Sequence, residues 1–75
     1  MKVYIVVEQD YEIINDIKVY LNKKFLLDKL YNENKEYIKS LKNTDNQKQV
    51  WLDYLEEQYK NENLEFFNIF EKEII

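Results

Sequence analysis

The sequence predicts a small α+β domain of the order ββααβ, in which an antiparallel sheet packs on two helices. Two observations carry this prediction. β-branched and other apolar residues run together or alternate in residues 3–21, as in strands, whereas apolar residues recur every three or four positions from residue 26 to residue 59, as in helices. Residues 64–75 fit a returning strand, but they also fit a helix, so a β-hairpin followed by helices only stays open as an alternative.

Length and composition indicate one folded domain. Its 75 residues are too few for two domains, so we expect residues 1–75 to form a single unit. Hydrophobic residues make up 45% of the chain, which is ordinary for a folded domain. Because Cys is absent, no disulfide supports the core, and unusually aromatic packing or association must stabilise it. Twelve residues are aromatic, and Tyr and Trp are also enriched at interfaces.

Two strands are expected at the start of the chain. Residues 3–7 form a short apolar run in which β-branched residues dominate, which is typical of a buried strand. Residues 9–12 are polar and contain no Gly, so we expect a loop longer than a two-residue turn there. Residues 13–21 alternate near their end, which indicates a second, half-buried strand. Ile17, Val19 and Leu21 share one side of it, and Lys18 and Tyr20 share the other.

A first helix is expected over residues 23–42. The apolar period changes at Asn22 from two to about 3.6, and Asn is a favoured N-cap residue. Leu21 and Leu26 have the spacing of a hydrophobic staple across this cap. The helix places Leu27, Leu30, Tyr31, Tyr37, Ile38 and Leu41 on one stripe.

A second helix is expected over residues 45–60, after a polar linker at residues 43–46. Thr44 and Gln47 have the spacing of a capping box, which favours a helix start at this point. Val50, Trp51, Tyr54, Leu55 and Tyr59 are expected to face inward.

Three segments resemble those of small phage and bacterial domains of unknown function. They are the opening MKVYIV, the passage IKVYLNKK at residues 17–24 and the segment LEFFNIFE at residues 64–71. Those domains have a β-hairpin, a helix and a returning strand, so the resemblance implies a final strand here and an origin in a mobile element. It implies no activity. The chain departs from those domains in lacking the Gly that commonly precedes the aromatic residue of the second strand, and in having a long helix around Trp51.

The composition excludes most familiar active sites. Because the chain has no Cys and no His, it lacks thiolate nucleophiles, the usual general base and the usual zinc ligands. Ser40 and Thr44 have no His to activate them, and a Gly-rich phosphate loop is impossible without Gly. We therefore expect no enzyme activity, no cofactor and no metal site.

Two patterns that could carry chemistry have simpler interpretations. Glu56 with Glu57, and Glu71 with Glu73, are close enough in sequence for glycosidase or metal-dependent work, but such pairs are usually solvated. Residues 43–47 carry oxygen-bearing side chains as a calcium loop does. An EF-hand needs Gly and an acid where this chain has Lys48 and Tyr54, so we interpret the segment as a helix cap.

Charge is distributed unevenly between the two halves. Residues 1–44 carry eight Lys and seven acidic residues, a balance of +1, whereas residues 45–75 carry three Lys and eight acidic residues, a balance of −5. An acidic field repels nucleic acid and attracts a basic groove on a nucleic-acid-binding protein. The predicted partner-binding residues are Asp53, Glu56, Glu57 and Glu62, with Tyr54 and Tyr59 as aromatic anchors. The alternative is a solvated helix face that only confers solubility.

Lys23 and Lys24 are an exception in this pattern of charge. They stand in the first turn of the first helix, where a cation opposes the helix dipole. Two interpretations stay open: the two lysines have no functional consequence, or they form a basic surface that binds a partner.

These features favour a non-enzymatic protein-binding module. Gly, Ala, Pro and Arg, whose codons are rich in G and C, are absent, which indicates a low-GC bacterium or a phage or plasmid living in one. We expect a phage or mobile-element inhibitor of a host defence nuclease, such as a CRISPR effector, that acts by occlusion with its acidic surface. Its expected partner is a larger host protein, with no direct contact to nucleic acid.

Two other classes of function stay open. One is a self-associating structural module, a homodimer formed by strand pairing at a sheet edge. The other is a small-ligand sponge that binds nucleotides in a Tyr/Trp pocket at a subunit junction. Under each of them we expect a cytoplasmic protein without a membrane segment, because no apolar run is long enough for a signal peptide or a span.

Overall fold

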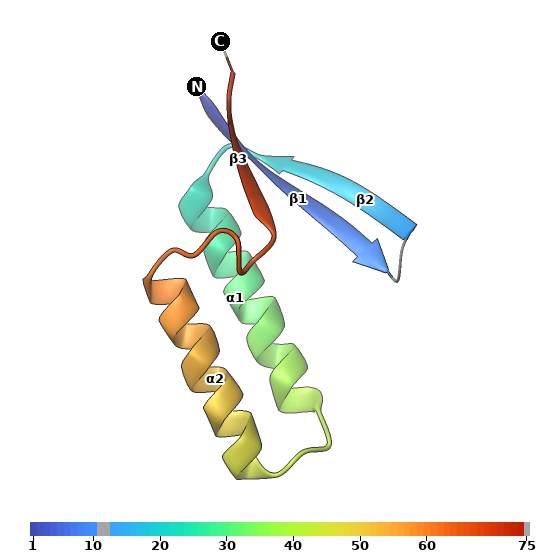
Figure 1. The fold of residues 1–75 in the computed structure, drawn as a ribbon, viewed down its shortest axis with the longest axis vertical. Helices are drawn as coiled ribbons and strands as arrows, with labels where there is room; N and C mark the ends of the chain where they lie inside the picture. The colour runs from blue at the N-terminus through green and yellow to red at the C-terminus, as the bar shows by residue number, and fades with distance from the viewer. Residues whose placement is uncertain (11–12, 75) are drawn as a thin grey trace.

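The computed structural model describes residues 1–10 and 13–74 (Figure 1). Its elements, in chain order, are β1 (Lys2–Asp10), β2 (Ile13–Tyr20), α1 (Lys23–Ser40), α2 (Asp45–Lys60) and β3 (Ile69–Glu73). The predicted α+β fold of order ββααβ is confirmed. Residues 69–73 form a strand, so a hairpin followed by helices only is wrong.

β1 is the central strand of an antiparallel sheet with the order β2-β1-β3. Ile5 pairs with Val19 of β2 and with Phe70 of β3. β3 reaches only residues 2–6 of β1, so the far end of the β1–β2 hairpin is a two-stranded ribbon (Figure 1).

The hairpin ladder extends further than the sequence predicted. It continues through an irregularity between Glu8 and Gln9 and ends where Asp10 pairs with Ile13. The predicted loop is therefore wrong for Gln9 and Asp10, while its other two residues, 11 and 12, lie outside the described residues. The backbone makes the ladder, so polar residues can continue it, and a bulge accommodates the change of register.

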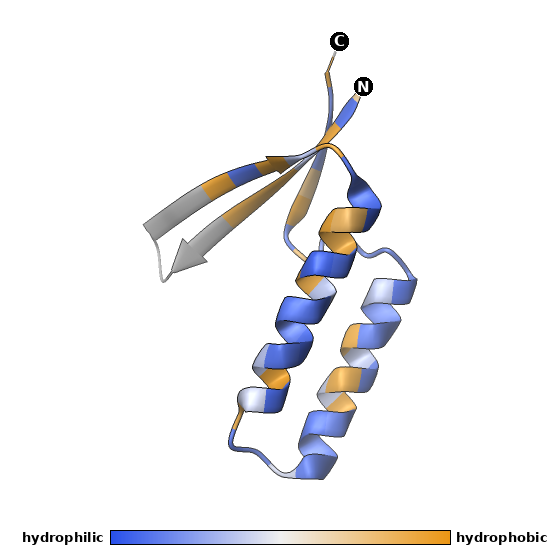
Figure 2. Ribbon diagram, turned by 180° about the vertical axis from the view of Figure 1, so that it is seen from behind, coloured by the Kyte–Doolittle hydropathy of each residue, from blue (hydrophilic) through white to orange (hydrophobic). Residues whose placement is uncertain are grey.

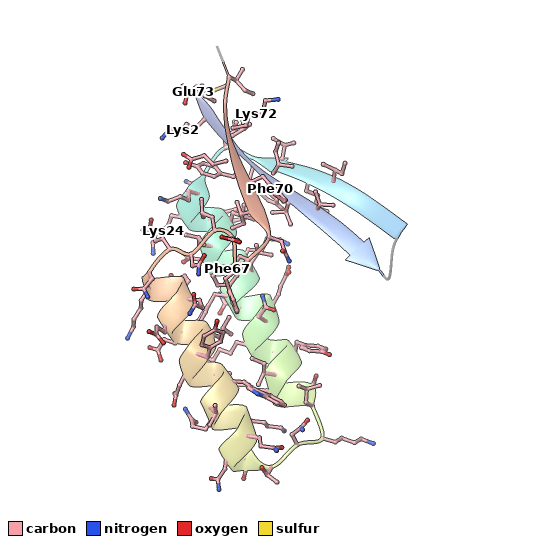
Figure 3. The ribbon with its side chains drawn as sticks, viewed as in Figure 1. Lys2, Lys24, Phe67, Phe70, Lys72 and Glu73 are labelled. Atoms are coloured by element: carbon pink, nitrogen blue, oxygen red, sulfur yellow. The ribbon has the colours of Figure 1, made fainter. Side chains whose placement is uncertain are left out.

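The helix side of the sheet carries the core. Tyr4 and Val6 of β1 and Ile69 of β3 lie on this side. The buried cluster consists of Tyr4, Val6, Leu26, Leu27, Leu55, Phe67 and Ile69. Figure 3 shows Phe67 where β3 approaches the helices and Phe70 further along β3, beside the hairpin.

The alternation predicted for the second strand is present, but its apolar side is not the covered one. Tyr20 packs against the core cluster. Ile17 and Val19 point to the opposite side of the sheet and are 57% and 60% exposed. The sequence pattern correctly separates the two sides of β2 but does not tell which side the helices cover.

The start of α1 matches the prediction. Asn22 caps the helix, and its Oδ1 accepts a hydrogen bond from the Phe25 backbone N–H at 3.0 Å. The first two turns place Leu26 and Leu27 in the core, Leu26 with no exposed surface. Leu21 is exposed, so the predicted staple between Leu21 and Leu26 buries little.

α2 has the bounds that the sequence predicted. Thr44 Oγ1 accepts a hydrogen bond from the Gln47 backbone N–H at 3.3 Å. Leu55 faces inward and is 2% exposed, but Val50, also predicted to face inward, is 65% exposed. The outer half of α2 lies beyond the sheet and has only α1 beside it, so its buried stripe is narrow (Figure 1).

The connection from α2 to β3 contains two left-handed residues. Glu62 has φ 51° and Asn68 has φ 56°, in the region that Gly usually occupies. At the end of α2, the Glu62 N–H donates to the Tyr59 carbonyl and the Asn63 N–H to the Gln58 carbonyl, which is the Schellman pattern of helix termination. A chain without Gly must form such a cap with another residue.

The molecule is long and flat, with principal extents of 48 × 29 × 15 Å. The two helices lie side by side and run away from the sheet. Both chain ends lie where β1 starts and β3 ends, on the side of the sheet away from the helices (Figure 1). Figure 2 shows hydrophobic bands on the strands and on parts of the helices, whose remaining turns are hydrophilic. This shape leaves two apolar regions exposed, one along the helix pair and one on the sheet.

Candidate functional site

Three of the predicted acidic residues lie together on α2. Asp53, Glu56 and Glu57, here called the acidic strip, are spaced three and four positions apart and line one shallow hollow. Asp53 Oδ1 accepts a hydrogen bond from Gln49 Nε2 at 2.7 Å, and Glu56 forms an ion pair with Lys60 at 3.1 Å. Both contacts are on the surface, so the acidic strip keeps an excess of negative charge.

An apolar groove lies between the second half of α1 and the middle of α2, and the connection from α2 to β3 also contributes to it. Its volume is about 310 Å³. We call it the aromatic groove because four aromatic residues line it: Tyr37, Trp51, Tyr54 and Phe66. Ile38, Leu41 and Leu55 complete its apolar lining. Phe66 packs edge-on against Tyr54, with ring centroids 5.4 Å apart at 84°. All four aromatic side chains keep a third or more of their surface exposed.

The acidic strip and the aromatic groove meet on α2 where Tyr54 and Glu57 are neighbours. Tyr54 follows Asp53 directly and stands three positions before Glu57, a spacing at which side chains are neighbours on a helix surface. An exposed aromatic region next to carboxylates is suited to a partner surface that offers an apolar side chain beside Lys or Arg.

The two other predicted partner-binding residues are engaged within the molecule. Glu62 forms an ion pair with Lys23 at 2.7 Å. The hydrogen bond and charge of Lys23 lower the pKa of Glu62, and those of Glu62 raise the pKa of Lys23. The Tyr59 hydroxyl donates to Asp28 of α1, and its ring packs on Tyr31 with centroids 4.5 Å apart. Glu62 and Tyr59 thus hold the ends of the two helices together.

The same contacts explain the cations in the first turn of α1. Lys23 is paired with Glu62. Lys24 Nζ lies 3.6 Å from Asp28 and donates to the Tyr59 hydroxyl at 3.3 Å, a hydrogen bond that is the main reason for its raised pKa. Glu62, which the fold brings to Lys23, and Asp28, one turn further along α1 from Lys24, therefore offset the unfavourable position of both lysines at the helix dipole.

Two kinds of feature are absent from the described part of the chain. Within residues 1–10 and 13–74, no group of three or more acidic, His or Cys side chains is placed to hold a metal ion. No helix among these residues is long and apolar enough to cross a membrane. The aromatic groove has no Lys in its lining, so nothing there would neutralise the phosphate of a nucleotide.

Sequence reasoning found the acidic strip but not the whole aromatic groove. Trp51 was expected inside the helix pair, and Tyr54 was expected both to face inward and to anchor a partner. Both line the groove at its surface. Tyr37 and Phe66 complete the groove and were not proposed as site residues. The available signal was the number of large aromatic residues in the second half of α1, the middle of α2 and the segment after α2.

Comparison of the chain with protein families, with curated proteins and with solved structures finds no match. The resemblance to phage and bacterial domains stays a prediction, and the functional conclusion depends on the geometry and chemistry of this chain.

Proposed function

We propose that this chain is a non-enzymatic protein-binding module, encoded by a phage or another mobile element, that inhibits a host defence nuclease such as a CRISPR effector in the host cytoplasm. One observation carries the proposal: the acidic strip adjoins the exposed aromatic groove on α2. The net charge of −4 and the absence of residues with GC-rich codons support it.

The proposed mechanism is occlusion of the channel in which the nuclease binds nucleic acid. Such channels are lined with Lys and Arg, which a surface bearing Asp53, Glu56 and Glu57 would meet in place of phosphates. Trp51 and Tyr54 would anchor the contact, because aromatic residues at the centre of an interface contribute most of its affinity. The carboxylates would mainly steer association and exclude other partners.

The test is cleavage of a labelled target DNA by a purified, guide-loaded CRISPR effector nuclease at increasing concentrations of this protein. We expect inhibition that weakens as salt is raised, because salt screens exposed charges. Reversing Asp53 and Glu57 to Lys should raise the concentration needed for half inhibition by about tenfold or more. Trp51→Ala should also weaken inhibition, but with less dependence on salt.

A matched control distinguishes the effect of charge at the acidic strip from the effect of the net charge of the protein. Glu33 and Glu36 are exposed on α1 and line neither the acidic hollow nor the aromatic groove. Reversing both to Lys changes the net charge as much as the α2 double variant does, but should leave inhibition within about twofold. Equal losses in the two variants, or full activity of the α2 variant, would overturn the proposed surface. A lack of inhibition across a panel of defence nucleases would refute the target class.

A further inference from the structure

The outer face of the sheet, which points away from the helices, is apolar and is exposed on the two flanking strands. On the central strand this side is covered, with Val3 3% exposed and Ile5 and Val7 partly buried. Successive side chains of a strand alternate between the two sides of a sheet. The apolar residues on this side, here called the outer face, are Ile5, Val7, Ile17, Val19 and Phe70. Val19, Ile5 and Phe70 form a row across the three strands, and Val7 pairs with Ile17 beside it. On the two flanking strands, Val19 and Phe70 are 60% and 59% exposed.

The charges of the sheet lie mainly on the other side. Tyr4, which belongs to the core, pairs with Glu71, and Val6, also in the core, pairs with Lys18. Residues that pair across an antiparallel ladder share a side, so Glu71 and Lys18 flank the core. In a sheet with one buried face, polar residues usually occupy the solvent face instead. The distribution seen here fits a sheet whose second face is also buried.

The chain exposes more surface than a compact monomer of its mass, so a partner could bury part of it. Its accessible surface is 5998 Å², whereas a compact monomer of 9.4 kDa exposes about 5,000 Å². Its radius of gyration is 13.8 Å, compared with about 11 Å for a compact domain of this length. The excess of roughly 1,000 Å² per chain is comparable to the ~800 Å² that each partner buries in a standard interface.

We propose that a second copy of this chain covers the outer face, giving a two-fold symmetric dimer in which the two sheets stack. A two-fold interface brings the same patch of both chains together, so an apolar face can pack against its own copy. The row Val19, Ile5 and Phe70 would form the centre of the contact, with the sheets about 10 Å apart. Lys72, the charged residue of β3 on this side, lies near the strand end and can remain solvated at the rim.

The proposed contact differs from strand pairing at a sheet edge and from the surface on α2. Edge pairing would use the backbone of β2 or β3 and would leave Val19 and Phe70 exposed. α2 contributes nothing to the outer face, so the dimer and the proposed inhibition stand or fall separately.

The test is the mass of the full chain in solution, measured by sedimentation equilibrium from about 1 to 500 µM. The wild type should reach twice 9.4 kDa within this range. Val19→Lys should raise the dissociation constant by about 100-fold or more, because each copy would bury an unpaired ammonium group. The matched control is Val50→Lys on α2, which makes the same change at a residue that is 65% exposed, and it should leave the dimer intact.

A measurement on the wild type covers the case that Val19→Lys does not fold. NMR spectra recorded on dilution should shift the signals of Ile5, Val19 and Phe70 most and leave those of Trp51 unchanged. A monomer at 500 µM would overturn the proposal. So would dissociation by Val50→Lys with no effect of Val19→Lys, or dilution shifts confined to the helices.

Discussion

Replacing Leu55 with Ala should remove a large share of the stability of this domain. Leu55 is 2% exposed and is the residue of α2 within the buried cluster, where it joins that helix to α1 and the sheet. Truncating a fully buried Leu to Ala costs about 2–5 kcal/mol, because the transfer energy is lost and a cavity remains. A domain of 75 residues has a total stability of roughly 4–11 kcal/mol. We therefore expect a loss of about 3 kcal/mol and a fall in Tm of roughly 12–24 °C.

Urea unfolding followed by circular dichroism measures this loss, at one fixed protein concentration because association would add to the apparent stability. Val50→Ala on the same helix is the control, since Val50 is largely exposed and its truncation should change the free energy of unfolding by less than about 0.5 kcal/mol. A loss below about 1 kcal/mol for Leu55→Ala, or equal effects of the two variants, would refute the assignment of Leu55 to the core.

Three further substitutions test individual contacts. Asn22→Ala removes the cap of α1 and should cost about 1 kcal/mol in urea unfolding, whereas Asn22→Ser should restore most of it. Tyr59→Phe removes the hydroxyl that donates to Asp28 but keeps the ring, so it should cost about 1 kcal/mol; an unchanged midpoint would show that this hydrogen bond contributes nothing. Glu62→Gln should lower the Tm slightly at pH 7. Because Lys23 lowers the pKa of Glu62 from 4.5, the pair stabilises the fold above that pH and the contribution is lost as the pH falls through the lowered pKa, so the wild-type and variant melting curves should converge in acid. A difference that persists in acid would contradict the ion pair.

Local signals in the sequence were sufficient to predict most of the helices and strands. The two helix starts were predictable because Asn22 and Thr44 satisfy backbone N–H groups within three residues of themselves, a purely local interaction. The final strand was ambiguous because residues 64–75 contain apolar residues at both periods. Pairing with β1, a contact between the two ends of the chain, decides that ambiguity.

Burial was harder to predict than secondary structure. Periodicity separates the sides of an element but does not reveal which other element covers them. Ile17 and Val19 share a side as expected, yet the helices cover the opposite side of the sheet. Val50 and Tyr54 were expected inside and are exposed, because the helix pair extends beyond the sheet.

Only part of the candidate site could be predicted, because the sequence specifies contacts within one helix but not contacts between elements. The acidic strip follows from spacing along one helix, which the sequence specifies directly. The pairing of Glu62 with Lys23 joins the end of α2 to the start of α1 and cannot be inferred from spacing. The aromatic groove likewise depends on how α1, α2 and Phe66 meet.

Because the molecule is elongated, its two exposed apolar regions lie apart and can make separate contacts. The outer face lies on the sheet, whereas the aromatic groove lies between the second half of α1 and the middle of α2. A dimer stacked through its sheets would leave α2 of both copies exposed and so carry two nuclease-binding surfaces. Two sites on one particle raise the apparent affinity only when the target presents two matching channels within reach. A monomeric Val19→Lys protein should therefore inhibit a target with one channel as well as the wild type does, and lose potency only against a target with two.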